Sequence, residues 1–160
     1  MFDIHSSLPD QGDSIIMKSQ LPKPTGAFVG ASWTALLVGS ITFLSGLWNG
    51  AMPNSEKGFY FTVLMFGLYA SVSLQKAVRD QMDGIPVTGI YFGLSWIAVG
   101  MAILLLTVGL WNANLGSSEK GFFAMSFLLS LFAAVAVQKN IRDLALFKEE
   151  SQQPEPAPEP

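Results

Sequence analysis

The chain has 160 residues, of which 50% are apolar and only 13% are charged, and its formal net charge is −3. Soluble domains carry about 25% charged residues, so this chain has too little charge to cover a water-facing surface. It has no cysteine, which excludes disulfides and thiolate metal sites, and no basic stripe, which argues against nucleic acid as a partner. These features indicate a membrane protein of one domain's length.

The first 24 residues form a polar head that contains His5, the one histidine of the chain. We expect this head to be a cytoplasmic tail. Because it precedes the first apolar run, that run begins too late in the chain for a cleaved signal peptide. We therefore expect the first run to be a retained helix.

Four apolar runs follow the head. Residues 27–48 and 90–111 contain no charged side chain, and at about 1.5 Å per residue each can cross a hydrocarbon core of about 30 Å. Residues 58–74 and 121–137 are shorter apolar runs, whose helices we expect to extend past the membrane. The sequence thus predicts an all-α polytopic membrane protein with four transmembrane helices, over about residues 27–48, 58–80, 90–111 and 121–146.

The alternative is a soluble four-helix bundle, which needs a polar stripe along each helix. Residues 90–111 have no such stripe, since Ser95, Thr107 and the tips of the aromatic side chains are their only polar groups. A helix that is apolar all round is buried in protein or in lipid, and a chain of 160 residues cannot bury four of them. The sequence therefore favours lipid as the surroundings of all four helices.

The chain contains an internal repeat in which residues 25–80 align with residues 88–143. The blocks "GLWN" and "SEKGF" occur in both copies, and "QKAVRD" aligns with "QKNIRD". Each copy holds two spans, so the second copy starts on the same side of the membrane as the first. We therefore predict two parallel helical hairpins, residues 25–83 and 84–148, followed by a disordered tail rich in Pro and Glu at residues 149–160.

The positions of the lysines and arginines predict the orientation. The two short hairpin loops hold Lys57 and Lys120, each beside a glutamate. The other seven basic residues lie on the opposite side of the spans: Lys18, Lys23, Lys76, Arg79, Lys139, Arg142 and Lys148. Because cytoplasmic segments are enriched in Lys and Arg, we expect both termini in the cytoplasm and the two "SEK" loops outside.

The repeated polar groups at the outer ends of the spans have two interpretations. In the first, Trp48 and Trp111 are interface aromatics among the lipid headgroups, while Ser55 and Ser118 cap the helices that follow. In the second, the loops form a site for an external ligand or a lipid headgroup. The residues of this candidate outer-face site are Asn49, Glu56, Lys57, Asn112, Glu119 and Lys120.

The inner ends of the spans carry the repeated block "QKxxRD". The cytoplasmic anchor that we expect there consists of Lys76, Arg79, Lys139 and Arg142. The spacing lets each lysine form an ion pair with the aspartate four residues later. We expect these residues to orient the chain and to touch anionic lipid, and a specific lipid or protein site is the alternative.

Small residues recur four apart at the start of the first and third spans. "GAFVG" and "GIYFG" are GxxxG motifs, formed by Gly26 with Gly30 and by Gly89 with Gly93. Small residues at this spacing let two membrane helices approach closely. We expect these glycines to mediate helix packing, either within one chain or between two.

The four apolar runs contain no Asp, Glu, Lys, Arg or His, whereas ion-coupled transporters and proton relays place such groups near the midplane. The sequence shows no nucleophile–base pair and no cluster of metal ligands. We therefore predict no catalytic residue, no metal site, no cofactor and no enzymatic activity. The expected partners are the lipid bilayer and a second copy of the chain or another membrane protein.

The blocks "GLWNxxxxxSEKGF" and "AVAVQKNIRD", duplicated along the chain, closely resemble the YiaA/YiaB inner-membrane family, whose unit is the YiaAB two-helix domain. The resemblance covers about residues 25–143, and the two tandem units are similar to the longer members of the family. It implies a bacterial inner-membrane protein with four spans, and it assigns no molecular activity and no catalytic residue.

Three functions stay open at this point. The first, which the sequence favours, is a structural or interaction role through the small-residue helix faces. The second is a small transporter or channel that acts as a dimer. The third is the binding of a ligand or lipid headgroup at the outer face.

Overall fold

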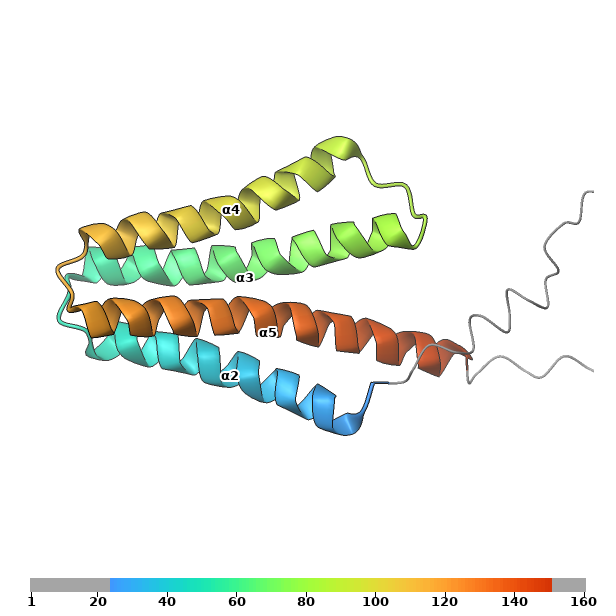
Figure 1. Cartoon of the computed structure of the whole chain (residues 1–160), viewed down its shortest axis with the longest axis horizontal. Helices are drawn as coiled ribbons and strands as arrows, with labels where there is room; N and C mark the ends of the chain where they lie inside the picture. The colour runs from blue at the N-terminus through green and yellow to red at the C-terminus, as the bar shows by residue number, and fades with distance from the viewer. Residues whose placement is uncertain (1–23, 151–160) are drawn as a thin grey trace, which may run out of the picture.

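The structure, a computed structural model, describes residues 24–150, with side chains for residues 24–148. Residues 1–23 and 151–160, which hold nearly all of both predicted polar tails, lie outside the described part. The described chain is helical, without strands, and its elements are α2 (Gly26–Asn49), α3 (Asn54–Met82), α4 (Gly89–Asn112) and α5 (Ser117–Glu150) (Figure 1). All four are long and apolar enough to cross a membrane, which confirms the predicted all-α membrane architecture.

The helices α2 and α4 begin in the same way because both copies of the repeat carry the same cap. The side-chain oxygen of Thr25 accepts a hydrogen bond from the N–H of Phe28 at 3.3 Å, and Thr88 accepts one from Tyr91 at 3.4 Å. Such N-caps satisfy backbone donors that the first helical turn leaves unpaired. Both helices are 24 residues long, so the two copies present first spans of equal length.

The helices α3 and α5 are longer, at 29 and 34 residues, and both continue past their apolar runs. Beyond the end of α3, Gly84 has a φ of 72°, and the N–H of Ile85 donates to the carbonyl of Asp80 at 2.9 Å. Glycine adopts this left-handed conformation without steric cost. The aligned part of α5 contains neither Gly nor Pro, so that helix continues to Glu150.

The helices pack across the two repeats rather than within them. α2 lies along α5 and α4 lies along α3, while α3 and α5 contact each other at the centre (Figure 1). Helices that follow each other inside one repeat make few contacts. The first helix of each repeat therefore packs against the second helix of the other repeat.

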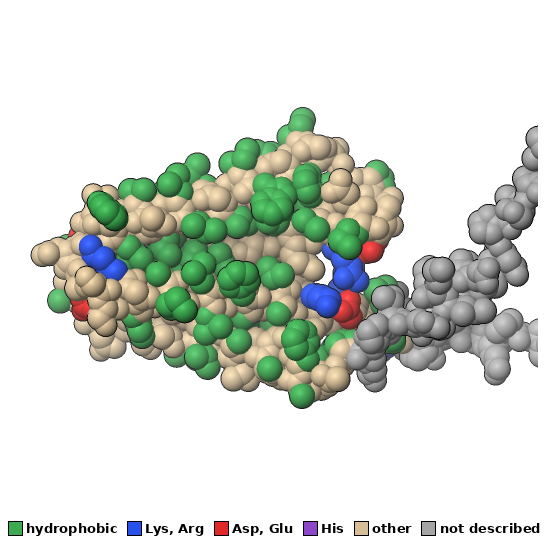
Figure 2. All heavy atoms as spheres, in the orientation of Figure 1, with side chains coloured by type: hydrophobic (Ala, Val, Ile, Leu, Met, Phe, Trp, Pro, Cys, Tyr) green, Lys and Arg blue, Asp and Glu red, His purple; other side chains and the backbone are tan. Residues whose placement is uncertain are grey.

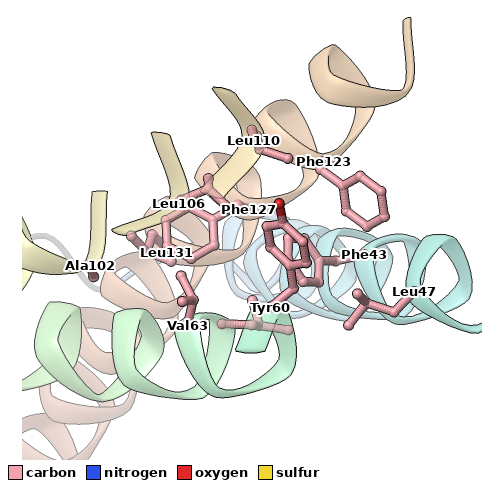
Figure 3. Close-up of a cluster of buried hydrophobic side chains, with 11 residues drawn as sticks. Phe43, Leu47, Tyr60, Val63, Ala102, Leu106, Leu110, Phe123, Phe127 and Leu131 are labelled. Carbon is pink, nitrogen blue, oxygen red and sulfur yellow. The ribbon is translucent and has the colours of Figure 1, made fainter. Parts of the chain in front are cut away.

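The core lies toward the end of the bundle that carries the two short connections, residues 50–53 and 113–116, which we call the loop end. Its buried side chains come from all four helices (Figure 3). The rings of Phe43 and Phe123 meet edge to face with centroids 5.3 Å apart, and Tyr60 stacks on Phe123 at 5.9 Å. Because these rings belong to α2, α3 and α5, the aromatic cluster joins both repeats.

The opposite end, which carries Lys76, Arg79, Lys139 and Arg142, is called the charged end. Between the two ends the surface is apolar: Ile41 of α2 is 59% exposed and Ile97 of α4 is 62% exposed. Figure 2 shows apolar side chains spread over the body of the visible face, with basic and acidic side chains toward its ends. Water-soluble monomers rarely expose so much contiguous apolar surface, whereas a bilayer requires it.

Candidate functional site

At the loop end, the two lysines of the candidate outer-face site cap the helices that precede them. The Nζ atom of Lys57 donates to the carbonyl oxygen of Trp48 at 3.0 Å, and Lys120 donates to Trp111 at 3.3 Å. The last carbonyls of a helix have no partner within it, and a basic side chain there also complements the helix dipole. Each lysine therefore ties the end of one helix to the start of the next.

The two asparagines of the candidate outer-face site bond to their own helices. The Nδ2 atom of Asn49 donates to the carbonyl of Ser45 at 2.9 Å, and Asn112 donates to Val108 at 2.8 Å. Each bond uses one N–H of the side-chain amide at the end of α2 or α4. In both copies of "WN", the Trp carbonyl accepts a hydrogen bond from the loop lysine and the Asn amide donates one to its own helix.

The prediction that Ser55 and Ser118 cap the second helices is wrong. Both residues lie inside the first turn, because α3 begins at Asn54 and α5 at Ser117. The carboxylate of Glu119 instead accepts a hydrogen bond from the N–H of Gly116 at 2.8 Å.

In the first copy, the residue before the helix is Pro53, which has no N–H. Glu56 therefore cannot form the bond that Glu119 forms, and α3 begins without a side-chain cap.

The repeated "GLWN" and "SEKGF" blocks contact each other across the two copies. A Cβ atom added at Gly46 would lie 2.8 Å from the ring of Phe122, and one added at Gly109 would lie 2.7 Å from the ring of Phe59. Both distances are too short for a real Cβ atom, so glycine is what allows the rings to pack there. This role was not predicted from the sequence, although the same glycine stands at the same position of both blocks.

A cavity of about 310 Å³ lies at the loop end between α2 and α5. It brings together Asn49 and Glu119 of the candidate outer-face site, with Ser118 and the ring of Phe122 beside them. The other four residues of the candidate site do not line it: Glu56, Lys57, Asn112 and Lys120. The structure thus places one asparagine and one glutamate from different repeats in the wall of the same cavity.

At the charged end, the two arginines of the predicted anchor join α3 to α5. Arg79 bonds to Asp143 at 3.2 Å, and Arg142 bonds to Asp80 at 3.0 Å. Arg142 also reaches Asp83 at 2.6 Å. The arginines therefore form an ion-pair network between the two central helices.

The two lysines of the anchor differ from each other. Lys76 forms the predicted i,i+4 ion pair with Asp80. Lys139 forms no ion pair with an acidic side chain among the described residues. The aspartate expected to pair with it, Asp143, is bonded to Arg79 instead.

A polar contact that was not predicted from the sequence joins α2 to α5. Asn140 is 1% exposed, and its Nδ2 atom donates to the hydroxyl of Ser32 at 3.0 Å. That hydroxyl donates in turn to the carbonyl of Phe28 at 2.8 Å. The aligned residues of the other repeat are Ala77 and Ser95, so only the α2–α5 pair has this bond. The difference between Asn and Ala in two otherwise similar blocks was the available signal.

The four GxxxG glycines have no close neighbour in the described chain. A Cβ atom added at Gly26, Gly30, Gly89 or Gly93 would meet no atom within 4 Å. Close approaches occur instead at Gly39, beside Ser130 of α5. Packing of the motifs between chains stays a prediction.

A second cavity, of about 500 Å³, lies between α3, α4 and α5. Its walls are apolar apart from Ser71, Gln75 and Arg79. The described residues contain no group of three or more His, Cys, Asp or Glu side chains that could hold a metal ion.

Comparisons with known proteins agree with the repeat and with the apolar helices. The family model described as the yiaA/B two helix domain matches the chain twice, at residues 28–80 and 91–143. Inner membrane protein YiaA of Escherichia coli (strain K12) is 50% identical over 130 residues, which are 81% of this chain and 90% of that protein. No solved structure matches. The chain therefore belongs to the yiaA/B two-helix-domain family and is an integral inner-membrane protein.

Proposed function

We propose that this protein has a structural or interaction role in the inner membrane, in which it binds a second copy of itself or another membrane protein. The binding surfaces are the glycine faces at the charged ends of α2 and α4, formed by Gly26 with Gly30 and by Gly89 with Gly93. In this proposal the protein acts by binding and not by catalysis.

The observation that carries the proposal is that neither motif packs against another part of residues 24–148, whose side chains the structure describes. A Cβ atom added at any of these glycines meets nothing within 4 Å. By contrast, Cβ atoms added at Gly39, Gly67 and Gly109 would collide with other helices. In lipid, the burial of apolar surface contributes little free energy to helix association. Membrane helices therefore associate through the close van der Waals packing that small residues allow. Two unoccupied motifs at equivalent positions therefore support association with a further helix.

Crosslinking in native membranes tests this role. The chain has no natural cysteine, so a single cysteine at exposed Ala27 can report contact with any neighbouring helix. We expect crosslinked products in the otherwise natural chain, and their loss when Gly30 and Gly93 are both changed to leucine. The control changes Gly58 and Gly121 to leucine, because these glycines also lack neighbours but lie outside the motifs. Absence of crosslinked products, or their persistence in the Gly30→Leu and Gly93→Leu variant, would contradict the role.

We also propose that the charged end and both termini face the cytoplasm. The support is the distribution of basic residues, since among the described basic residues only Lys57 and Lys120 lie at the loop end. Single cysteines at exposed Ser118 and exposed Gln81 can be labelled with an impermeant maleimide in intact spheroplasts. We expect labelling at Ser118→Cys alone. Labelling at Gln81→Cys would reverse the orientation.

A second candidate function is the binding of a small external solute in the cavity at the loop end. Its support is that Asn49 and Glu119 both line this cavity, although they come from different repeats. The carboxylate favours a cationic solute with a hydrogen-bond donor. A thermal-shift screen of small amines on the purified protein should find a stabilising compound.

The matched control for this screen comes from the repeat. The stabilisation by the amine should disappear in Asn49→Ala with Glu119→Gln. It should persist in Asn112→Ala with Glu56→Gln, because those residues do not line the cavity. An equal loss of stabilisation in both double variants, or the absence of any stabilising amine, would contradict this function.

A further inference from the structure

The cavity of about 500 Å³ is an apolar groove along α3, α4 and α5, in the half of the bundle nearer the charged end. Its walls include Val78 of α3, Trp96 of α4 and Val135 of α5. Trp96 is 55% exposed, so the groove is open on the surface that faces lipid. The hydroxyl of Ser71 in its wall donates to the carbonyl of Gly67 at 2.7 Å. That polar group is therefore satisfied by its own helix.

The groove has one charged wall residue, Arg79, and this arginine belongs to the charged end. The polarity of the groove thus changes along its length, from a guanidinium at its mouth to side chains such as Ile103 and Leu128 deeper in the bundle. A phospholipid in one leaflet shows the same change, from a polar headgroup at the membrane surface to apolar acyl chains deeper in the bilayer. Figure 2 shows the packed surface hollowed beside the basic and acidic side chains at this end.

A second cation lies near the mouth of the groove. Lys139 follows Val135 by one helical turn on α5, so the two residues share a helix face. It is exposed, and among the described residues no acidic side chain pairs with it. Its repeat equivalent, Lys76, is bonded to Asp80. Among the described residues, the groove mouth therefore has a charge without an acidic partner, whereas the equivalent lysine of the other repeat has one.

We propose that this groove binds an anionic phospholipid, with one acyl chain along the apolar walls and the phosphate beside Lys139, close to Arg79, whose guanidinium is already paired with Asp143 and Asp83. Basic pockets between membrane helices bind anionic headgroups, and a volume of about 300–1,000 Å³ is typical of small-molecule sites. The basic side chains at the mouth select an anionic headgroup, and the apolar walls of the groove bind the acyl chain.

The internal repeat supplies a matched fluorescence test. Trp96 lines the groove, and Trp33 is its equivalent in the other repeat. Two full-length variants each keep one of these tryptophans and carry phenylalanine at the other three positions. Each is placed in phosphatidylcholine vesicles that contain a small, equal fraction of brominated phosphatidylglycerol or brominated phosphatidylcholine. Bromine quenches tryptophan only at close range, so the quenching measures which lipid occupies the site.

We expect brominated phosphatidylglycerol to quench Trp96 with an apparent affinity about fivefold higher than that of brominated phosphatidylcholine, the effect of one basic side chain. The two lipids should quench Trp33 equally. In the Trp96 variant, Lys139→Gln should remove most of the preference without reducing quenching by phosphatidylcholine. Val135→Phe should reduce quenching by both lipids, whereas the equivalent Val72→Phe should leave it unchanged.

Four results would overturn the proposal. Equal quenching of Trp96 by both lipids would show ordinary contact with the bilayer. An equal preference at Trp33 would show a general attraction of anionic lipid. If the preference for phosphatidylglycerol persists in Lys139→Gln, Lys139 does not bind the headgroup. Absence of quenching at Trp96 would show that another protein helix fills the groove.

Discussion

The Nη1 atom of Arg142 in α5 lies 3.0 Å from Oδ1 of Asp80 in α3, and Asp80 is buried. The equivalent residues form the reverse pair, from Arg79 to Asp143 at 3.2 Å. The two copies of the block "QKxxRD" therefore exchange their arginine and aspartate partners. The block fastens the two central helices to each other as well as concentrating positive charge at one end.

Removing Arg142 should cost more stability than removing Lys76, although both bond to Asp80. The Arg142 side chain is 27% exposed and that of Lys76 is 59% exposed, and water weakens an exposed pair. We expect Arg142→Gln to lower the free energy of unfolding by about 1 kcal/mol and Lys76→Gln by about half of that or less. Thermal unfolding in detergent measures both. Equal losses would contradict the bridging role of Arg142.

Closing the space at Gly109 should destabilise the loop end. A Cβ atom there would lie 2.7 Å from the ring of Phe59, so we expect Gly109→Val to lower the free energy of unfolding by about 1–3 kcal/mol. Gly100→Val is the control, because a Cβ atom at Gly100 of the same helix meets nothing within 4 Å. Phe59→Ala in the same chain should recover part of the loss. If the two valine variants are equally stable, the contact has no energetic role.

The bond between Asn140 and Ser32 should contribute a coupling free energy of about 0.6 kcal/mol, the average for interhelical hydrogen bonds in a membrane. A double-mutant cycle with Asn140→Ala and Ser32→Ala measures this coupling. The control cycle uses Ser95→Ala with Ala77→Gly, the aligned positions, where no side-chain hydrogen bond joins the helices. Strictly additive losses in the first cycle would show that the bond does not stabilise α2 against α5.

Replacing the two loop lysines should affect folding rather than ligand binding. Lys57→Gln and Lys120→Gln each remove a charged donor to a helix-end carbonyl. We expect each change to lower the free energy of unfolding by about 0.3–1 kcal/mol. Lys57→Arg should retain most of the stability, because arginine keeps the charge and the donors. If Lys57→Gln is as stable as the natural chain, the cap is not what the lysine provides.

The four spans could be predicted from the sequence because the length and apolar character of a helix decide whether it crosses a bilayer. The pairing of the helices could not be predicted in this way. Two tandem repeats can pack as separate hairpins or exchange partners, and both arrangements present the same hydropathy along the chain. The deciding contacts are local in space and distant in sequence, as between Phe59 and Gly109.

The residues at which α3 and α5 begin show a second limit on what the sequence can predict. A serine before an acidic residue is a common N-cap signal, yet Ser55 and Ser118 lie inside their helices. Both helices start at aligned positions, Asn54 and Ser117, although only the second copy has the bond from the N–H of Gly116 to the Glu119 carboxylate. The GxxxG motifs were likewise easy to find, whereas Gly46 and Gly109 owe their importance to rings on other helices.

The exchange of partners between repeats has a consequence for chains that contain a single unit. In this protein α2 buries its inner face mainly on α5, and α4 does so on α3. A lone α2–α3 hairpin has no such surface available, because its two helices scarcely touch each other. Cutting the chain between the units should therefore produce halves that are stable only as a reassembled pair. A natural protein with one copy would complete its fold by homodimerisation.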